Sequence, residues 1–390
     1  GGDPFRATRV RSLKNAHWHV LQLEQIAEQP GVFKMWVIVH GQMRSFTLTV
    51  PRVFYVNTRT EDNFEKWPRV NLKLPRGSPC LYLYEFRQSE ARYQRMFHDV
   101  KMLAELMSHP DVEGVYETKV PLDYRALVQL GCIVQLAADS KHSNTDIDFE
   151  LKDLDVKRDR NIVQRSYLPR NSFDYIYLYH SAGQAANDRR AIYGLFFSAT
   201  KKATILVVDT VINNQLGNVR RLYETNRSDR ENWLRQWAAA QTDIMGDPIR
   251  FEHLVPQEYK FEVHHVLPER QLYTALQKAV TDHVLEVREN GDQRPTLLVA
   301  QTATPVTKLA QSVPAFNDYP CLNINHNHLH NNYPALQWQE AAVKQMFITS
   351  VFKEEWLDTQ IEHARYGQVP VGNLPPDVTT FVADIEFSRQ

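Results

Sequence analysis

The stretch RPTLLVAQTATPVTKLA, residues 294–310, decides the fold of the second half of the chain. Thr296–Ala300 is a short apolar run behind Pro295, which predicts a buried β-strand followed by a polar turn and a helix. In many metal-dependent nucleases a carboxylate follows such a strand and holds Mg²⁺. No acid stands between Gln301 and Thr307. Either a carboxylate has been lost from this place, or no such site was ever present.

The segments around this stretch predict an α/β unit. Three apolar segments rich in aromatic and β-branched residues precede it, at 173–180, 191–199 and 202–211. A strand pattern at 261–268 and a helix pattern at 269–287 come directly before the stretch, and a long helical pattern at 338–367 follows it. Strands therefore come first in this half, and helices follow them.

The first half of the chain has the alternating pattern of β-strands between residues 16 and 57. Apolar residues near helical spacing predict one amphipathic helix at 89–110, which ends before Pro110. The apolar run 126–137 predicts a further strand. A charged stretch from Lys152 to Arg170 is the best candidate for a boundary between two units.

The composition is that of an ordinary globular protein, and it limits the possible partners. The 45 lysines and arginines nearly balance the 46 acids, which argues against wholesale wrapping of nucleic acid but permits a local basic patch. The three cysteines lie far apart and predict no zinc framework. No apolar run approaches the ~20 residues that a membrane-spanning helix needs. The first residues, 1–15, predict a linker or the edge of a longer polypeptide.

Two weak signals for metal binding are present. His326, His328 and His330 alternate in NHNHLHNN, so an extended backbone would place them on one side, as zinc or copper requires. Histidines in an exposed Asn-rich loop are more often simply solvated. Asp209 ends the strand TILVVD, but Val211 stands at the next position on its face, and a lone acid there is more often a turn or cap residue.

Several longer strings resemble one protein family. The strings are PRVFYVN (51–57), LYLYEF (81–86), DVEGVYETKVPL (111–122), RALVQLGC (125–132), YIYLYH (175–180), VVDTVINNQ (207–215) and PVGNLPPDVTTF (370–381). In this order, from about residue 16 to the end of the chain, they resemble the non-catalytic C-terminal half of the DNA polymerase epsilon catalytic subunit.

The resemblance implies a degenerate B-family polymerase and exonuclease module, α/β in the second half and α+β overall. It implies a β-rich B-family N-terminal-domain-like region at 16–170 and an inactive ribonuclease-H-like 3′–5′ exonuclease domain at 171–369. Residues 370–390 would begin the connection to a vestigial palm.

The resemblance also implies which positions of this sequence correspond to the catalytic acids of an active exonuclease. The DxE motif of the first strand would fall on AIYGLFFSA, which has no acid, or on TILVVDTV, where Asp209 is followed by Val211. The Asn and Asp of the second motif would fall on Gln301 and Val306.

The third motif, YxxxD on a helix, would put its acid near Ala342 or Val343, with Trp338 near the Tyr place. Glu340 lies close in sequence but about 160–200° away around the helix. No shift of one or two residues restores three convergent carboxylates, so we expect no nuclease activity and no cofactor.

The function that the resemblance implies is architectural. The expected partners are the second subunit of polymerase epsilon, the MCM-containing replicative helicase and the active N-terminal polymerase half of the same subunit, all in the nucleus. DNA is a further candidate partner. Two alternatives remain open at this point: a nucleic-acid-binding module that uses the old exonuclease groove, and a residual nuclease.

Overall fold

The structure is a computed structural model of the 390-residue chain. It describes residues 12–61, 67–97, 101–157, 172–182, 191–208, 259–265, 269–323 and 370–373, together with isolated positions between them. The chain divides into two compact units, one made of Gly1–Tyr167 with Ala364–Asn373 and the other of Leu168–His363 with Leu374–Gln390. No helix in the described ranges is long and apolar enough to cross a membrane.

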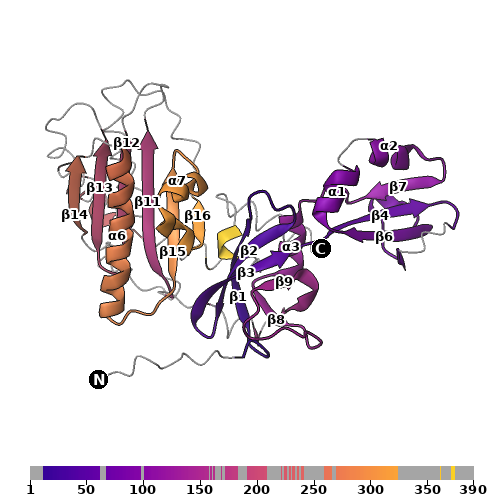
Figure 1. The fold of residues 1–390 in the computed structure, drawn as a ribbon, viewed down its shortest axis with the longest axis horizontal. Coiled ribbons are helices and arrows are strands. Elements are labelled where there is room, and N and C mark those ends of the chain that lie inside the picture. The colour runs from indigo at the N-terminus through magenta and orange to yellow at the C-terminus, as the bar shows by residue number, and fades with distance from the viewer. Residues whose placement is uncertain are drawn as a thin grey trace. The chain divides into compact units, whose positions relative to one another are not determined.

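The first unit contains a six-stranded sheet with the order β10-β8-β1-β2-β3-β9 (Figure 1). His40 and Gly41 join β2 to β3 in a two-residue turn, and both have the positive φ that a tight hairpin of this length requires. Rings of Trp18, Phe46 and Phe149 meet at the centre of the core. The strands are β1 (Trp18–Gln25), β2 (Val32–Val39), β3 (Gln42–Thr49), β8 (Ile133–Leu136), β9 (Asp148–Glu150) and β10 (Leu154–Val156).

A helix covers this core where we predicted a strand. Residues 122–130 form α3 (Leu122–Leu130), which buries Leu122, Ala126 and Leu130 at i, i+4 and i+8. Gly131, with φ of 63°, ends the helix, and β8 follows it. The prediction of one strand over 126–137 is therefore wrong for its first part, because an apolar run this short fits either period.

A four-stranded sheet in the same unit has the order β5-β6-β4-β7 and carries helices on one face. The helices α1 (Glu90–Phe97) and α2 (Lys101–Ser108) lie within the predicted helix 89–110, and residues 98–100 between them are outside the described part. Phe54 and Val56 pack with Tyr93 in the core under these helices. The strands are β4 (Arg52–Thr58), β5 (Arg69–Val70), β6 (Tyr82–Gln88) and β7 (Val112–Tyr116).

A short segment from residues 371–373 packs against the first sheet. The 3-10 turn η6 (Val371–Asn373) lies against β1, and the Asn373 side chain pairs with both backbone groups of Leu23. Its Oδ1 accepts from the Leu23 amide at 2.7 Å, and its Nδ2 donates to the Leu23 carbonyl at 3.0 Å. The side-chain amide thereby stands in for a neighbouring strand at this position.

The second unit contains a six-stranded mixed sheet with the order β14-β13-β12-β11-β15-β16. The first three strands in sequence, β11, β12 and β13, are antiparallel, whereas β14 runs parallel to β13, and β15 and β16 run parallel to β11. The strands are β11 (Asp174–Ala182), β12 (Ala191–Phe197), β13 (Lys202–Val208), β14 (Lys260–His265), β15 (Thr296–Thr302) and β16 (Cys321–Asn323).

Two helices lie against one face of this sheet (Figure 1). The longer, α6 (Glu269–Glu289), buries Leu272, Leu276 and Val280 against it, and α7 (Val306–Ser312) follows β15. The predicted strand at 296–300 and the predicted helix at 269–287 are both confirmed. The long helical pattern predicted at 338–367 lies almost entirely outside the described residues.

Candidate functional site

Residues 296–302 of the quoted stretch form β15, which lies between β11 and β16. Neither neighbour is one of the two strands that we considered for the first motif. β11 and β15 are parallel, with Leu178 opposite Ala300 and His180 opposite Thr302. AIYGLFFSA forms β12, one strand further from β15, and TILVV forms β13, two strands further. Neither of those two strands is a neighbour of β15. The carboxyl ends of β11 and β15 are therefore the place where a metal site of the expected kind would form.

Apolar side chains fill this place. Leu178 and Ala300 are fully buried, and Val306 and Leu309 at the start of α7 belong to the same core cluster. Val306 occupies the position predicted for the second-motif Asp. Because its neighbours are close-packed hydrocarbon, a divalent cation here would meet no oxygen ligand from these residues and would lose its hydration.

Gln301, predicted at the second-motif Asn place, lies on the other face of the sheet from this cluster. Side chains alternate along β15, and Ala300 belongs to the helix-covered face. Gln301 is only 1 % exposed and pairs in register with Tyr179. The two predicted second-motif positions are thus both described, but the structure does not bring them together on one face.

His180 is the polar side chain that stands nearest the carboxyl end of β11 on the helix-covered face. It is 3 % exposed, and its ring stacks on Tyr193 with centroids 4.3 Å apart. Burial lowers the pKa of His180 to about 4, so the imidazole is neutral at pH 7. The polar side chain at this edge of the sheet is therefore uncharged at pH 7. The sequence signal that could have pointed to β11 is its place as the first of three consecutive apolar segments.

The acid on β11, Asp174, lies at the opposite end of the strand, and both of its carboxylate oxygens are hydrogen-bonded within the protein. Asp174 is 1 % exposed, and its Oδ2 lies 2.8 Å from Nε2 of His283 on α6. Its Oδ1 accepts from the Ser198 hydroxyl at 3.0 Å and from the Ala199 amide at 3.1 Å. The carboxylate therefore joins β11, the end of β12 and α6 inside the core, and its role is structural.

The remaining candidates from the sequence lie outside the described residues: Asp209, Val211, Ala342, His326, His328 and His330. Within the ranges that the structure describes, no group of three or more His, Cys, Asp or Glu side chains is arranged to hold a metal ion.

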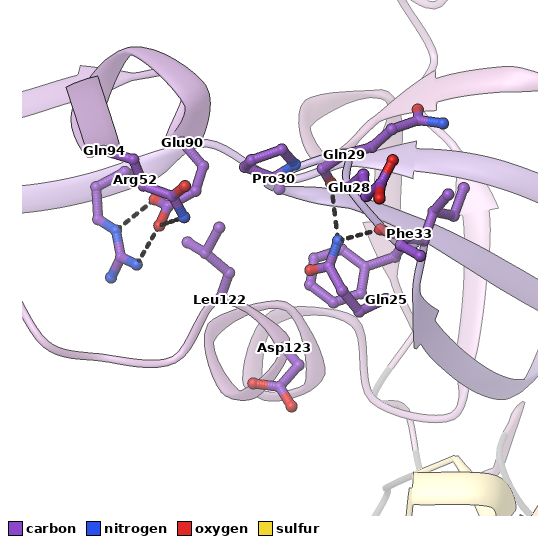
Figure 2. Close-up of a pocket in the computed structure, with 13 residues that line it drawn as sticks. Gln25, Glu28, Gln29, Pro30, Phe33, Arg52, Glu90, Gln94, Leu122 and Asp123 are labelled. Carbon is purple, nitrogen blue, oxygen red and sulfur yellow. Dashed lines mark hydrogen bonds and ion pairs between the residues drawn. The ribbon is translucent and has the colours of Figure 1, made fainter. Parts of the chain in front are cut away.

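The first unit contains a pocket of about 470 Å³ beside the turn that joins β1 to β2 (Figure 2). Arg52 reaches Glu90 with two hydrogen bonds of 2.7 and 2.8 Å on one wall, and Leu122 points between this pair and the turn. The exposed acids Glu28 and Asp123 also line it. Because Glu90 already neutralises Arg52, the rim disfavours a phosphate.

The turn beside this pocket is fixed from both sides. Nε2 of Gln25 lies within 3.0 Å of the carbonyl oxygens of Ile26, Gln29 and Val32. Gly31 has φ of 76°, and a Cβ there would lie 2.9 Å from Glu90 Cβ and 2.9 Å from the Val50 carbonyl oxygen. The close approach of the turn to α1 therefore requires glycine at this position.

Sequence similarity to known proteins extends over the whole chain. A family model described as "Domain of unknown function (DUF1744)" matches residues 238–390. The chain is 32% identical over 389 residues to one of the DNA polymerase epsilon catalytic subunits of Arabidopsis thaliana. The match covers 100% of this chain and 16% of that protein.

Two further relatives give the same pattern. Identity is 31% over 390 residues to another DNA polymerase epsilon catalytic subunit of Arabidopsis thaliana, and 26% over 404 residues to one from Emericella nidulans. Each match covers 100% of this chain but only 16% and 17% of those proteins. The chain is thus similar to these subunits along its whole length, and it spans about a sixth of theirs.

Proposed function

We propose that this chain is a non-catalytic structural module of the catalytic subunit of DNA polymerase epsilon and serves DNA replication in the nucleus. The observation that carries the proposal is the filling of the carboxyl ends of β11 and β15 by Leu178, Ala300 and Val306. Similarity over the whole chain to subunits of that name supports the assignment to this polymerase.

The topology of the second unit supports a ribonuclease-H-like exonuclease origin. Along the chain, three antiparallel strands come first, and a long helix precedes two strands that run parallel to the first. In the sheet these five strands have the order β13-β12-β11-β15-β16, and β14 is an additional outer strand beside β13. A ribonuclease-H-like fold has the same order and directions in its five strands. We propose that the scaffold has been kept and the exonuclease site lost, while the parent subunit is a DNA-directed DNA polymerase.

In this proposal the module acts through its surfaces. A fold that no longer supports catalysis can still hold other proteins in place. Its partners are the second subunit of polymerase epsilon, the MCM-containing helicase and the active N-terminal half of the same subunit. The packed cores of both units support this role, because a rigid surface loses less conformational entropy on binding.

Two alternatives are less well supported. The first alternative is a module that binds nucleic acid in the old exonuclease groove. It is less well supported because the described side chains at the ends of β11 and β15 are buried and are apolar or neutral. For a residual nuclease, at least two convergent carboxylates are needed for Mg²⁺, and the acid on β11, Asp174, is used by the core.

The scaffold proposal is tested by binding. The chain is immobilised, and the purified second subunit of polymerase epsilon and the purified MCM-containing helicase are passed over it separately, beside single-stranded and duplex DNA. We expect saturable binding of at least one protein partner at physiological salt. Binding of DNA alone, with neither protein partner retained, would overturn the scaffold role for this chain.

A further inference from the structure

A second surface in the first unit has the composition of a ligand site. The four-stranded sheet carries its helices on the face of Phe54, Val56 and Val115, so alternation puts Tyr55 and Tyr116 on the opposite face. These two tyrosines are register partners on β4 and β7. Both are half-buried, and both line a pocket of about 550 Å³.

Hydrogen bonds from the phenol groups fix the two rings. The Tyr55 hydroxyl donates to Glu85 Oε2 at 3.4 Å, and the Tyr116 hydroxyl donates to Glu113 Oε2 at 2.9 Å. Each ring is therefore held at its tip, so little rotamer entropy remains to be lost when a ligand packs against it.

A cationic loop also lines the pocket. Lys73, Arg76 and the exposed Leu72 line it beside the two tyrosines. Within the part of the chain that the structure describes, neither Lys73 nor Arg76 has an ion-pair partner. The acid of the pocket, Glu117, is already bound to Arg125 at 2.7 Å. Glu85 and Glu113, at the tips of the two rings, are also engaged, Glu85 with Arg87 at 3.3 Å and Glu113 with the Asn57 amide at 2.9 Å. Among the described residues, Lys73 and Arg76 are therefore the charges of the pocket lining that no ion pair engages.

The backbone of this loop is held in an unfavourable conformation at one of the cations. Arg76 has φ of 58° and ψ of 26°, a left-handed conformation that glycine adopts more easily, and Gly77 after it has φ of 71°. Such outliers cluster at ligand-binding sites, where the strained residue is held for its function.

We propose that this pocket binds single-stranded nucleic acid, with a base packed against Tyr55 and Tyr116 and the flanking phosphates on Lys73 and Arg76. Base stacking on aromatic rings beside a positively charged groove is how single strands are bound without sequence preference. A proline-rich peptide would use the rings but not the two cations, and an acidic peptide would use the cations but not the rings. A nucleotide uses both at once. This site is separate from the exonuclease-like sheet and does not depend on the scaffold role.

The test measures fluorescence anisotropy of a labelled single-stranded oligo-dT of about 12 nucleotides with the whole chain. Tyr55→Leu and Tyr116→Leu should each weaken binding about tenfold, since each removes one stacking partner. The matched variants Tyr55→Phe and Tyr116→Phe keep the ring and should bind within about twofold of the wild type.

The cations are tested by Lys73→Gln combined with Arg76→Gly, because glycine fits the left-handed backbone at position 76. Losing two phosphate contacts should lower the slope of log affinity against log salt by about 1.4, at ~0.7 per contact for single strands. The control, Lys14→Gln with Lys141→Gln, removes two exposed cations of the same unit and should leave the slope unchanged.

Thermal melting of each variant ensures that the comparison is made between folded proteins. The proposal is overturned if the wild type does not bind the oligonucleotide, if the leucine and phenylalanine variants bind alike, or if duplex DNA binds as tightly as the single strand. Preferential binding of a proline-rich or an acidic peptide to this pocket would also overturn it.

Discussion

Nε2 of His283 on α6 lies 2.8 Å from Oδ2 of Asp174 on β11, and both side chains are almost completely buried between the helix and the sheet. The pair joins α6, the longest of the described helices, to β11. Ser198 and Ala199 donate to the other carboxylate oxygen, so one carboxylate is shared by three elements. Asp174, the acid on β11, is thus part of the core.

Removing this acid should destabilise the second unit strongly. Asp174→Ala leaves the buried donors of His283 and Ser198 without an acceptor, and we expect a loss of about 3–5 kcal/mol in the free energy of unfolding. Chemical denaturation measures it. The control is Asp282→Ala on the same helix, which breaks the exposed pair with Lys278 and should cost no more than about 0.5 kcal/mol. Equal losses for the two variants would contradict the structural role of Asp174.

A carboxylate introduced at Leu178 of β11 should not be tolerated. Leu178→Asp would bury a charge among hydrocarbon, and we expect a destabilisation of at least about 3 kcal/mol in denaturant titrations. Leu178→Met keeps the packing and should cost less than about 1.5 kcal/mol. Leu285→Asp, on the exposed face of α6, controls for the new acid itself. A stable Leu178→Asp protein would show that the place is still open to a charged ligand.

His180 should make the second unit sensitive to acid. Burial lowers its pKa to about 4 from the usual 6.5, so the unfolded chain binds the proton more readily between these values. The stabilisation is complete above pH 6.5 and is lost as the pH falls towards 4, by up to about 3 kcal/mol. His180→Phe should remove this part of the pH dependence, which melting curves at pH 7 and 4.5 would detect. An unchanged difference between the two pH values would exclude His180 as its source.

His142 in the first unit should have the opposite effect. Burial alone would lower its pKa, but hydrogen bonds of 2.9 Å to Asp153 and 3.0 Å to Asp146, with the charges of both acids, raise it overall. The stabilisation is therefore complete below pH 6.5 and is lost as the pH rises through the raised pKa. We expect His142→Gln to remove this loss of stability as the pH rises above 6.5, which melting curves across neutral pH would measure. A variant that keeps the full loss would contradict the assignment.

The contact of residues 371–373 with β1 should depend on glycine. A Cβ at Gly372 would lie 2.7 Å from Gln22 Cβ and 2.9 Å from the Leu21 carbonyl oxygen. Gly372→Ala should therefore cost the first unit about 1–3 kcal/mol in denaturant titrations. Gly41→Asn is the control, since asparagine tolerates positive φ and nothing lies within 4 Å of a Cβ there. A neutral Gly372→Ala would mean that the segment does not close on β1 in solution.

The sequence predicts those elements whose apolar pattern is long and periodic or is bounded by clear turn signals. The helix at 269–287 is confirmed because its spacing fits only the helical period, and the strand at 296–300 is confirmed because its run, between Pro295 and a polar turn, is too short for a helix. The prediction of a strand over 126–137 is wrong in its first part, since those apolar residues fit a helix from Leu122 to Leu130 as well as a strand, and the contacts with the sheet select the helix.

The candidate site is harder to place from the sequence, because its position depends on which strands are neighbours. Sequence order alone does not say that β11, rather than β12 or β13, lies beside β15. His180 is therefore not a candidate in the sequence, although it lies where the two parallel strands end. The pairing of Asp174 with His283, 109 residues apart, has no signature in the sequence for the same reason.

In the proposed function the second unit keeps an exonuclease scaffold without its chemistry. The most direct measurement is release of labelled 3′-terminal nucleotides from a single-stranded oligonucleotide by the purified chain, with Mg²⁺ or Mn²⁺, beside an active exonuclease at the same concentration. We predict no release above the protein-free blank with either metal. Release that requires the metal, follows the chain through purification and disappears in Asp209→Ala would contradict the account.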